Sequence, residues 1–219
     1  MELKGKKINF LGDSITQGVG TSCEDKIYLN LIKKEYALSC ARNYGISGTR
    51  IARQQKPSAE PSFDLDFCRR ADEMDADADV VVVFGGTNDY GHGDAPLGSF
   101  GDEKENTFYG ACRVLCEKLI KKYPRAEIVV MTPLHRTDED NMRGDCNKEY
   151  NVAPLERYVE IIKQTAKYYA LPVLDLYAVS GIQPNVDFIK ERYAPDGLHP
   201  NDAGHERIAK RLAAFLKAL

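Results

Sequence analysis

A serine near the amino end of the chain stands where a nucleophile could act. Ser14 lies in the turn Gly12-Asp13-Ser14, which follows the apolar run Ile8 to Leu11 and precedes a polar segment that can form a helix. This order predicts a strand, a tight turn and a helix start, where free backbone N–H groups and the helix dipole favour negative charge. Ser14 could therefore be a nucleophile or only a helix cap, and the choice depends on whether the chain supplies a base.

An aspartate and a histidine near the carboxyl end could supply that base. Asp196 and His199 lie in the segment D-G-L-H-P, just before an amphipathic closing segment. Asp196 could fold back through a turn at Gly197 and fix the imidazole tautomer, so that the other ring nitrogen of His199 faces Ser14. The order serine, aspartate, histidine is one that known triads adopt. A loop Asp and a loop His that only cap a helix would give the same pattern.

Acyl transfer through a serine also needs hydrogen-bond donors for the oxyanion. The N–H of Ser14 is one candidate. Gly48 offers a second N–H in a loop where the absence of a Cβ permits close approach, and Asn88 offers a side-chain amide after the valine-rich run 80–84. Gly48 could instead serve only a turn, and Asn88 only an Asx turn. Their joint placement after successive predicted strands favours the oxyanion role.

Alternating strands and helices must position these residues. Apolar runs and helical spacing predict strands at 8–11, 38–43, 79–84, 127–132 and 172–176, and helices at 27–36, 64–74, 106–122, 152–169 and 202–219. The unbroken run Val80 to Phe84 indicates a strand that is buried on both faces. We therefore expect one α/β domain, residues 1–219, with a parallel sheet, and the loops at the carboxyl ends of its strands should form the ligand site.

The composition describes an ordinary globular protein and excludes several classes. The 219 residues carry a formal net charge of −3, which provides no basic surface for nucleic acid or an anionic membrane. The longest apolar run is far too short for membrane insertion, and no signal peptide precedes the first strand, so we expect a cytoplasmic protein. The six cysteines lack C-x-x-C pairs and are expected to be small buried hydrophobes.

The chain resembles the SGNH hydrolases, the superfamily of the GDSL esterases and lipases. Four blocks of that superfamily are matched in order, by Gly12-Asp13-Ser14, Gly48, Gly86-Thr87-Asn88-Asp89 and Asp196-Gly197-Leu198-His199-Pro200. Ile15 stands in place of the usual Leu, which leaves the chemistry unchanged. The resemblance spans nearly the whole chain, and it implies a three-layer α/β/α sandwich around a flavodoxin-like five-stranded parallel sheet.

The resemblance also implies serine-dependent ester hydrolysis through an acyl-enzyme. Ser14 would be the nucleophile, His199 the base and then the acid, and Asp196 its orienting partner. The N–H groups of Ser14 and Gly48 and the side chain of Asn88 would form the oxyanion hole. No metal and no organic cofactor is implied.

The sequence favours a small-molecule ester substrate, with short acyl groups and acetyl first among them. The residues placed at the mouth are polar and no long apolar lid is visible, which argues against a triglyceride lipase. An acetylated carbohydrate is a candidate. Lysophospholipases and thioesterases of the same superfamily are alternatives. Two further alternatives belong to other classes of protein. A metal-dependent phosphoesterase would need more Asp, His and Asn ligands than are found. A non-catalytic binding module is disfavoured by the intact Ser14, Asp196 and His199.

Loops should border the mouth of this site and offer contacts with substrate. The candidates for such contacts are Asp13, Tyr90, His92 and His135. Residues 91–105 are expected to form a rim loop, and 133–150 a long polar connection. We expect its part 136–147 to pack over the mouth of its own chain or of a neighbour, which leaves a homo-oligomer open. His205 is expected to lie at the surface or to cap a helix.

Overall fold

Five parallel strands form the central sheet of the computed structural model, which describes residues 1–146, 148 and 153–219. The strand order is β2-β1-β3-β4-β5. The strands are β1 (Lys7–Gly12), β2 (Cys40–Gly45), β3 (Val80–Phe84), β4 (Glu127–Met131) and β5 (Val173–Leu174). This is the flavodoxin-like order, and its switch point lies between β1 and β3, where loops on adjacent strands lead to opposite faces.

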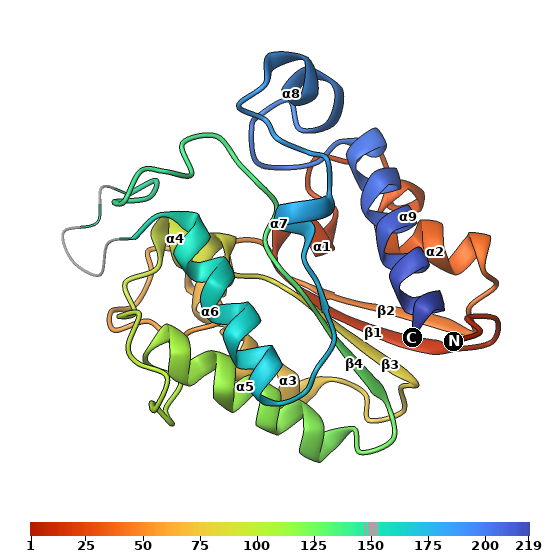
Figure 1. Cartoon of the computed structure of the whole chain (residues 1–219), viewed down its shortest axis with the longest axis horizontal. Coiled ribbons are helices and arrows are strands. Elements are labelled where there is room, and N and C mark those ends of the chain that lie inside the picture. The colour runs from red at the N-terminus through yellow and green to blue at the C-terminus, as the bar shows by residue number, and fades with distance from the viewer. Residues whose placement is uncertain (147, 149–152) are drawn as a thin grey trace.

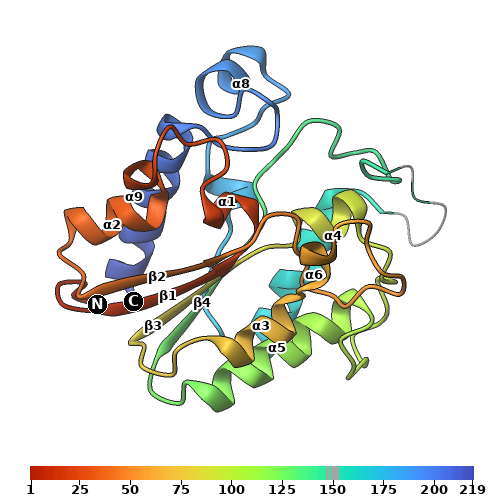
Figure 2. The same cartoon turned by 180° about the vertical axis from the view of Figure 1, so that it is seen from behind.

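Both faces of the sheet are buried, because the side chains of its inner strands alternate between two apolar clusters. In β3, Val80, Val82 and Phe84 belong to one cluster, whereas Val81 and Val83 belong to the other. Helices cover each face, as Figures 1 and 2 show from opposite sides. The structure therefore confirms the predicted α/β/α sandwich and explains why the valine run carries no polar residue.

The first layer consists of α2 (Tyr28–Glu35) and α9 (Asp202–Ala218), which pack side by side. The second layer consists of α3 (Phe67–Glu73), α5 (Phe108–Lys122) and α6 (Leu155–Tyr168). The two chain ends lie together, and the ammonium group of Met1 donates to the carbonyl oxygen of Leu216 at 3.1 Å. None of the helices in the described ranges is long and apolar enough to cross a lipid bilayer.

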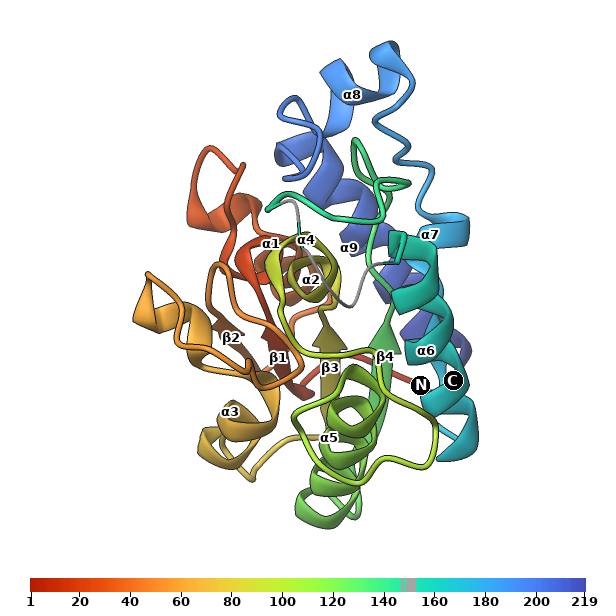
Figure 3. The same ribbon diagram turned by 90° about the vertical axis from the view of Figure 1, so that its left-hand side faces the viewer.

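Several short elements lie outside the predicted set, mostly near the carboxyl ends of the strands. They are α1 (Ser14–Gln17), η1 (Glu24–Lys26), η2 (Pro61–Asp64), α4 (Thr87–His92), α7 (Leu176–Val179) and α8 (Asp187–Tyr193). Figure 3 shows α8 projecting furthest from the sheet, beyond α9. Elements of three to seven residues contain too few turns to show an apolar period, so their sequences give little signal.

Caps account for the main shifts in element boundaries. β5 ends at Leu174 rather than at the predicted 176, because the carboxylate of Asp175 caps α7 and accepts the N–H of Ala178. The helix predicted from 64 begins at Phe67, since Asp66 caps it. The helix predicted over 152–169 begins at Leu155 after Pro154, and Val152 lies outside the described residues.

Candidate active site

The turn between β1 and α1 presents Ser14 as the first residue of the helix. The preceding Asp13 is the N-cap, and its carboxylate accepts the N–H of Ile15 at 3.0 Å. A Cβ on Gly12 would lie 2.0 Å from Thr16 Oγ1, so this tight turn requires glycine. The turn thus places a serine hydroxyl at the carboxyl end of β1, beside the switch point of the sheet.

The imidazole of His199 lies between Ser14 and Asp196. Its Nε2 is 3.1 Å from Ser14 Oγ, and its Nδ1 is 2.7 Å from Asp196 Oδ2. The second carboxylate oxygen of Asp196 accepts the N–H groups of Leu198 and His199 at 2.8 Å and 2.7 Å. Residues 185 positions apart in the chain are therefore joined in one row of hydrogen-bonding groups.

The carboxyl group of Asp196 is held in its charged form. Partial burial favours the neutral acid, but the N–H of Leu198 and the side chain and N–H of His199 outweigh it and lower the pKa of Asp196 below its ordinary value. A charged carboxylate at Nδ1 fixes the tautomer of the ring and stabilises the imidazolium that forms when Nε2 takes a proton. The electrostatics thus suit a base directed at Ser14.

The candidate oxyanion donors lie in the loops after β1, β2 and β3. Gly48 has φ +74°, and a Cβ there would meet the ring of Phe63 at 2.1 Å, so the loop requires glycine. Asn88 Nδ2 donates to the carbonyl oxygen of Thr49 at 3.0 Å, which holds Asn88 against the residue that follows Gly48. Within the described ranges, the N–H groups of Ser14 and Gly48 donate to no backbone or side-chain acceptor. Both are thus free to receive a ligand.

A buried carboxylate ties the Gly48 loop to α4. Asp89 accepts the N–H groups of Ile51 and Ala52, each at 2.9 Å. Burial raises the pKa of Asp89 to about 7, although those two hydrogen bonds oppose the shift. Asp13 is likewise buried, and desolvation raises its pKa to about 6. Both carboxylates hold backbone in place at the edge of the site.

The structure distributes the four candidate substrate contacts unevenly. Asp13 is 2% exposed and Tyr90 1% exposed, and the Tyr90 hydroxyl donates to the carbonyl oxygens of Asp138 and Asn141. Both polar groups are thus bonded within the chain, and a contact of either residue with substrate stays a prediction. His92 and His135 are partly exposed. His92 contacts Asn88, whereas His135 pairs with Glu139 at 2.8 Å on the β4 side.

The described part of segment 136–147 packs on its own chain, and Asn147 lies outside the described residues. The N–H of Thr137 donates to the carbonyl oxygen of Gly197 at 2.9 Å, and the N–H of Asp145 donates to that of Gly91 at 2.7 Å. The segment therefore contacts both the turn that carries His199 and Gly91, which lies in α4 rather than in the loop predicted from 91.

Two arginines near the site were not singled out in the sequence, and the prediction for one histidine was wrong. Arg50 and Arg70 follow no motif, yet both are buried and donate to groups around the Gly48 loop. His205, expected at the surface, is fully buried and accepts the N–H of Tyr28 at its Nδ1. Burial lowers the pKa of His205 to about 4, so it is neutral at pH 7. A helix that buries one face gives no signal that a histidine on it is part of the core.

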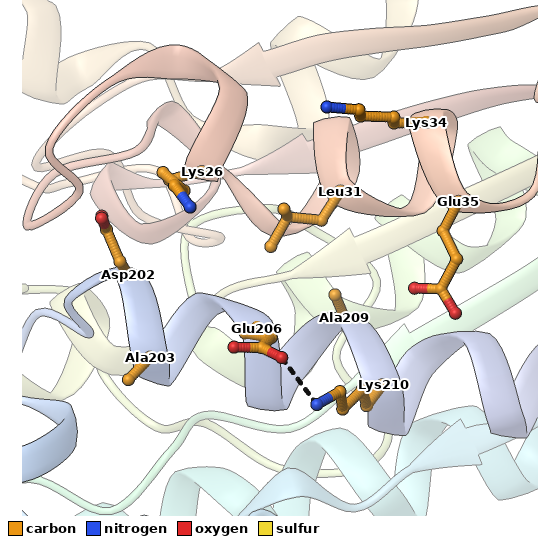
Figure 4. Close-up of a pocket in the computed structure, with 9 residues that line it drawn as sticks. All are labelled: Lys26, Leu31, Lys34, Glu35, Asp202, Ala203, Glu206, Ala209 and Lys210. Carbon is orange, nitrogen blue, oxygen red and sulfur yellow. Dashed lines mark hydrogen bonds and ion pairs between the residues drawn. The ribbon is translucent and has the colours of Figure 1, made fainter.

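Two hollows in the surface differ in their relation to this site. A groove of about 640 Å³ separates α2 from α9 (Figure 4), and its walls are formed largely by charged side chains such as the Glu206–Lys210 ion pair. It includes neither Ser14 nor His199. A recess of about 410 Å³ is lined by Arg50, Phe63 and His92; it also includes neither Ser14 nor His199, and its wall meets the candidate site through His92, which contacts Asn88. In the described part of the chain, no cluster of three or more His, Cys, Asp or Glu side chains is placed to hold a metal ion.

Comparison with known proteins identifies the family. Residues 10–207 match the sequence profile of the GDSL-like Lipase/Acylhydrolase family, which is most of the chain. The chain belongs to that family, and the resemblance deduced from the four sequence blocks is confirmed. A search of curated proteins finds no significant match.

Solved structures support the same conclusion. A protein from Lactobacillus plantarum is 30% identical, with 98% of each chain covered and a TM-score of 0.83. An acetyl xylan esterase is 24% identical over 95% of this chain and 98% of its own, with a TM-score of 0.64. A two-domain esterase active on acetylated mannans is 22% identical over 99% of this chain and 50% of its own, with a TM-score of 0.62. The last two likenesses concern the fold.

Proposed function

We propose that this chain is a serine-dependent carboxylic ester hydrolase with Ser14, His199 and Asp196 as its triad. The observation that carries the proposal is the row of groups in which His199 lies 3.1 Å from Ser14 Oγ and 2.7 Å from Asp196 Oδ2. Membership of the GDSL-like family supports the reaction class. Ester cleavage then follows from ordinary triad chemistry.

In the first half of the reaction, His199 Nε2 takes the proton of the Ser14 hydroxyl as Oγ attacks the ester carbonyl. The carbonyl π electrons move to its oxygen, and that oxyanion accepts hydrogen bonds from the N–H groups of Ser14 and Gly48 and from Asn88 Nδ2. The imidazolium then returns its proton to the leaving alcohol as the C–O bond breaks. Each oxyanion donor of this kind contributes about 10²- to 10³-fold to kcat.

In the second half, water attacks the acyl-enzyme. His199 removes a proton from that water, and the same donors stabilise the second oxyanion. Collapse of this intermediate releases the carboxylic acid, and the proton on Nε2 returns to Ser14 Oγ. Asp196 keeps the ring in one tautomer through both halves, because its charge stays beside Nδ1.

We infer that the substrate is a small ester with a short acyl group, acetyl first among them, and that an acetylated carbohydrate is the physiological candidate. Structural relatives described as an acetyl xylan esterase and as an esterase active on acetylated mannans support this choice. The recess lined by Arg50, Phe63 and His92 also supports it, since Lys56 and Ser58 give its wall groups that can bond to hydroxyls.

The test compares hydrolysis of p-nitrophenyl acetate and butyrate by the wild type and by Ser14→Ala, with EDTA present throughout. We expect turnover of acetate in preference to butyrate, and a loss of about a thousandfold or more in Ser14→Ala. Ser99→Ala, which changes a loop serine bonded to Asp102, is the matched control and should retain full activity.

Other outcomes decide against parts of the proposal. Equal activity in wild type and Ser14→Ala would show that the triad is wrong. Hydrolysis of p-nitrophenyl phosphate that EDTA abolishes would favour a metal-dependent phosphoesterase. Preference for long acyl chains or thioesters would favour a lysophospholipase or thioesterase, and a protein inactive on all these esters that still binds acetylated sugars would be a binding module.

A further inference from the structure

A second row of hydrogen-bonding groups ends on Asn88. His92 lies one turn after Asn88 in α4, and its Nε2 is 3.2 Å from Asn88 Oδ1. The Nδ1 of the same ring is 2.8 Å from Arg50 Nη2 and 3.1 Å from Arg50 Nε. Arg50 is itself buried and is held by Ser58 Oγ at 2.9 Å and by Asp64 at 3.5 Å.

The chemistry of Arg50 fixes the tautomer of His92. A guanidinium has donors only and keeps its proton in proteins, so the nitrogen that faces it must be an acceptor. His92 Nδ1 is therefore unprotonated, and the ring proton is on Nε2, where it donates to Asn88 Oδ1. Burial, with the charge of Arg50, lowers the pKa of His92 to about 4, so the ring stays neutral at pH 7.

This tautomer in turn fixes the amide of Asn88. Oδ1 faces the His92 N–H, and Nδ2 donates one hydrogen to the carbonyl oxygen of Thr49. Both contacts require the same orientation of the amide, so the second hydrogen on Nδ2 is left for a ligand. Hydrogen bonds in series also polarise one another, which strengthens the last donor.

We propose that Arg50 and His92 are positioning residues that orient and polarise Asn88 as an oxyanion donor. The inference rests on the proposed ester hydrolysis and extends it. It makes the site two-sided, with Asp196–His199 acting on the nucleophile and Arg50–His92 acting on the oxyanion. Neither Arg50 nor His92 needs to touch the substrate for this role.

The kinetic test uses three variants and p-nitrophenyl acetate. His92→Phe keeps an aromatic ring beside Phe63, whose ring centroid lies 5.4 Å from that of His92, but removes both nitrogens. Arg50→Met removes the group that selects the tautomer. His92→Gln retains an N–H for Asn88 and an oxygen for Arg50. We expect His92→Phe and Arg50→Met to lower kcat about tenfold to a hundredfold with KM within about threefold, and His92→Gln to recover most of the loss.

A matched control separates this effect from a general loss of positive charge. Lys33 is exposed on α2 and lines neither hollow, so Lys33→Gln should keep kcat within about twofold. The affinity of a boronic acid that adds to Ser14 gives a second readout. Because its adduct places negative charge at the oxyanion position, its Ki should rise in each variant by the factor by which kcat/KM falls.

A spectroscopic measurement tests the tautomer without depending on activity. The imidazole ¹⁵N spectrum, with the His92 signals assigned by their absence in His92→Gln, should show Nδ1 unprotonated and Nε2 protonated in the wild type at pH 7. Loss of that pattern in Arg50→Met supports the inference even if another ester proves to be the substrate. If Arg50→Met does not fold, the His92 variants decide. A wild-type ring protonated on Nδ1, or a folded His92→Phe with unchanged kcat, would overturn it.

Discussion

The guanidinium of Arg70 donates a hydrogen bond of 3.1 Å to the carbonyl oxygen of Gly12. The same buried side chain donates to the carbonyl oxygen of Tyr44 at 2.6 Å and to Thr49 Oγ1 at 2.8 Å. One cation from α3 therefore joins the ends of β1 and β2 to the loop that carries Gly48. Burial lowers the pKa of Arg70 to about 10, against the opposing charge of Asp13, and it remains a cation at pH 7.

Replacing Arg70 should therefore cost much more stability than replacing its neighbour. Arg70→Met leaves the carbonyl oxygens of Gly12 and Tyr44 without this donor, and we expect the free energy of unfolding to fall by about 3 kcal/mol or more. Arg69→Met, at a side chain 62% exposed, should change it by about 0.5 kcal/mol or less. Urea denaturation of both variants measures the difference, and equal midpoints would contradict the assignment.

Gly48 and Gly5 provide a matched pair for the oxyanion loop. Their φ angles are +74° and +76°, so alanine should meet a similar backbone cost of about 1–2 kcal/mol at each. Around Gly5 there is no atom within 4 Å of a new Cβ, whereas at Gly48 it would meet the ring of Phe63. We expect Gly48→Ala to displace the loop and lower kcat more than tenfold, and Gly5→Ala to lower stability alone. Steady-state kinetics beside thermal melts test this, and equal kcat in both variants would refute it.

Asp196→Asn tests the orientation of His199 without changing side-chain size. The asparagine amide can donate an N–H to Nδ1 of His199, whereas the carboxylate can only accept the N–H of that ring. The substitution therefore favours the wrong tautomer of His199, and kcat in such triads falls about 10⁴-fold. Asp202→Asn is the control, because that exposed carboxylate binds Ser22 instead. Rates on p-nitrophenyl acetate distinguish the two, and a similar small loss in both would mean that His199 needs no carboxylate.

The larger features of the fold could be predicted because each depends on a repeated local pattern. The run Val80 to Phe84 is apolar at every position because both faces of β3 are covered. The amphipathic spacing of α5, α6 and α9 follows from burial of a single stripe. The four motif blocks then predicted that Ser14, Gly48, Asn88 and His199 lie next to the ends of the predicted strands and helices.

The supporting residues could not be predicted, since their roles arise only from tertiary contacts. Arg50 and Arg70 look like any surface arginine in the sequence, and their burial depends on acceptors 5 to 58 positions away. His205 joins the core because α2 and α9 pack together, which places the ring centroid of Tyr28 5.9 Å from that of His205. Tyr90 is buried by the 136–146 segment, whose sequence has no helical or strand periodicity from which its path could be predicted.

The pH dependence of stability should carry a contribution from Asp89. Its pKa is raised to about 7 in the folded chain, from an ordinary value of 3.8, because burial disfavours the charged form. Between about pH 4 and pH 7 the folded chain therefore holds a proton that the unfolded chain has released. This stabilisation is fully present below about pH 4 and is lost as the pH rises through 7.

Asp89→Asn removes this titration, because asparagine resembles the protonated acid at every pH. The quantity to follow is the free energy of unfolding of the wild type minus that of Asp89→Asn. We expect this difference to fall as the pH rises from about 4.5 to about 7.5, by at most about 1.4 kcal/mol per pH unit. Urea denaturation at several pH values measures both proteins, and Asp25→Asn, at an exposed position, serves as the parallel control. A difference between wild type and Asp89→Asn that stays constant with pH would mean that the carboxylate, held by the N–H groups of Ile51 and Ala52, is charged throughout this range.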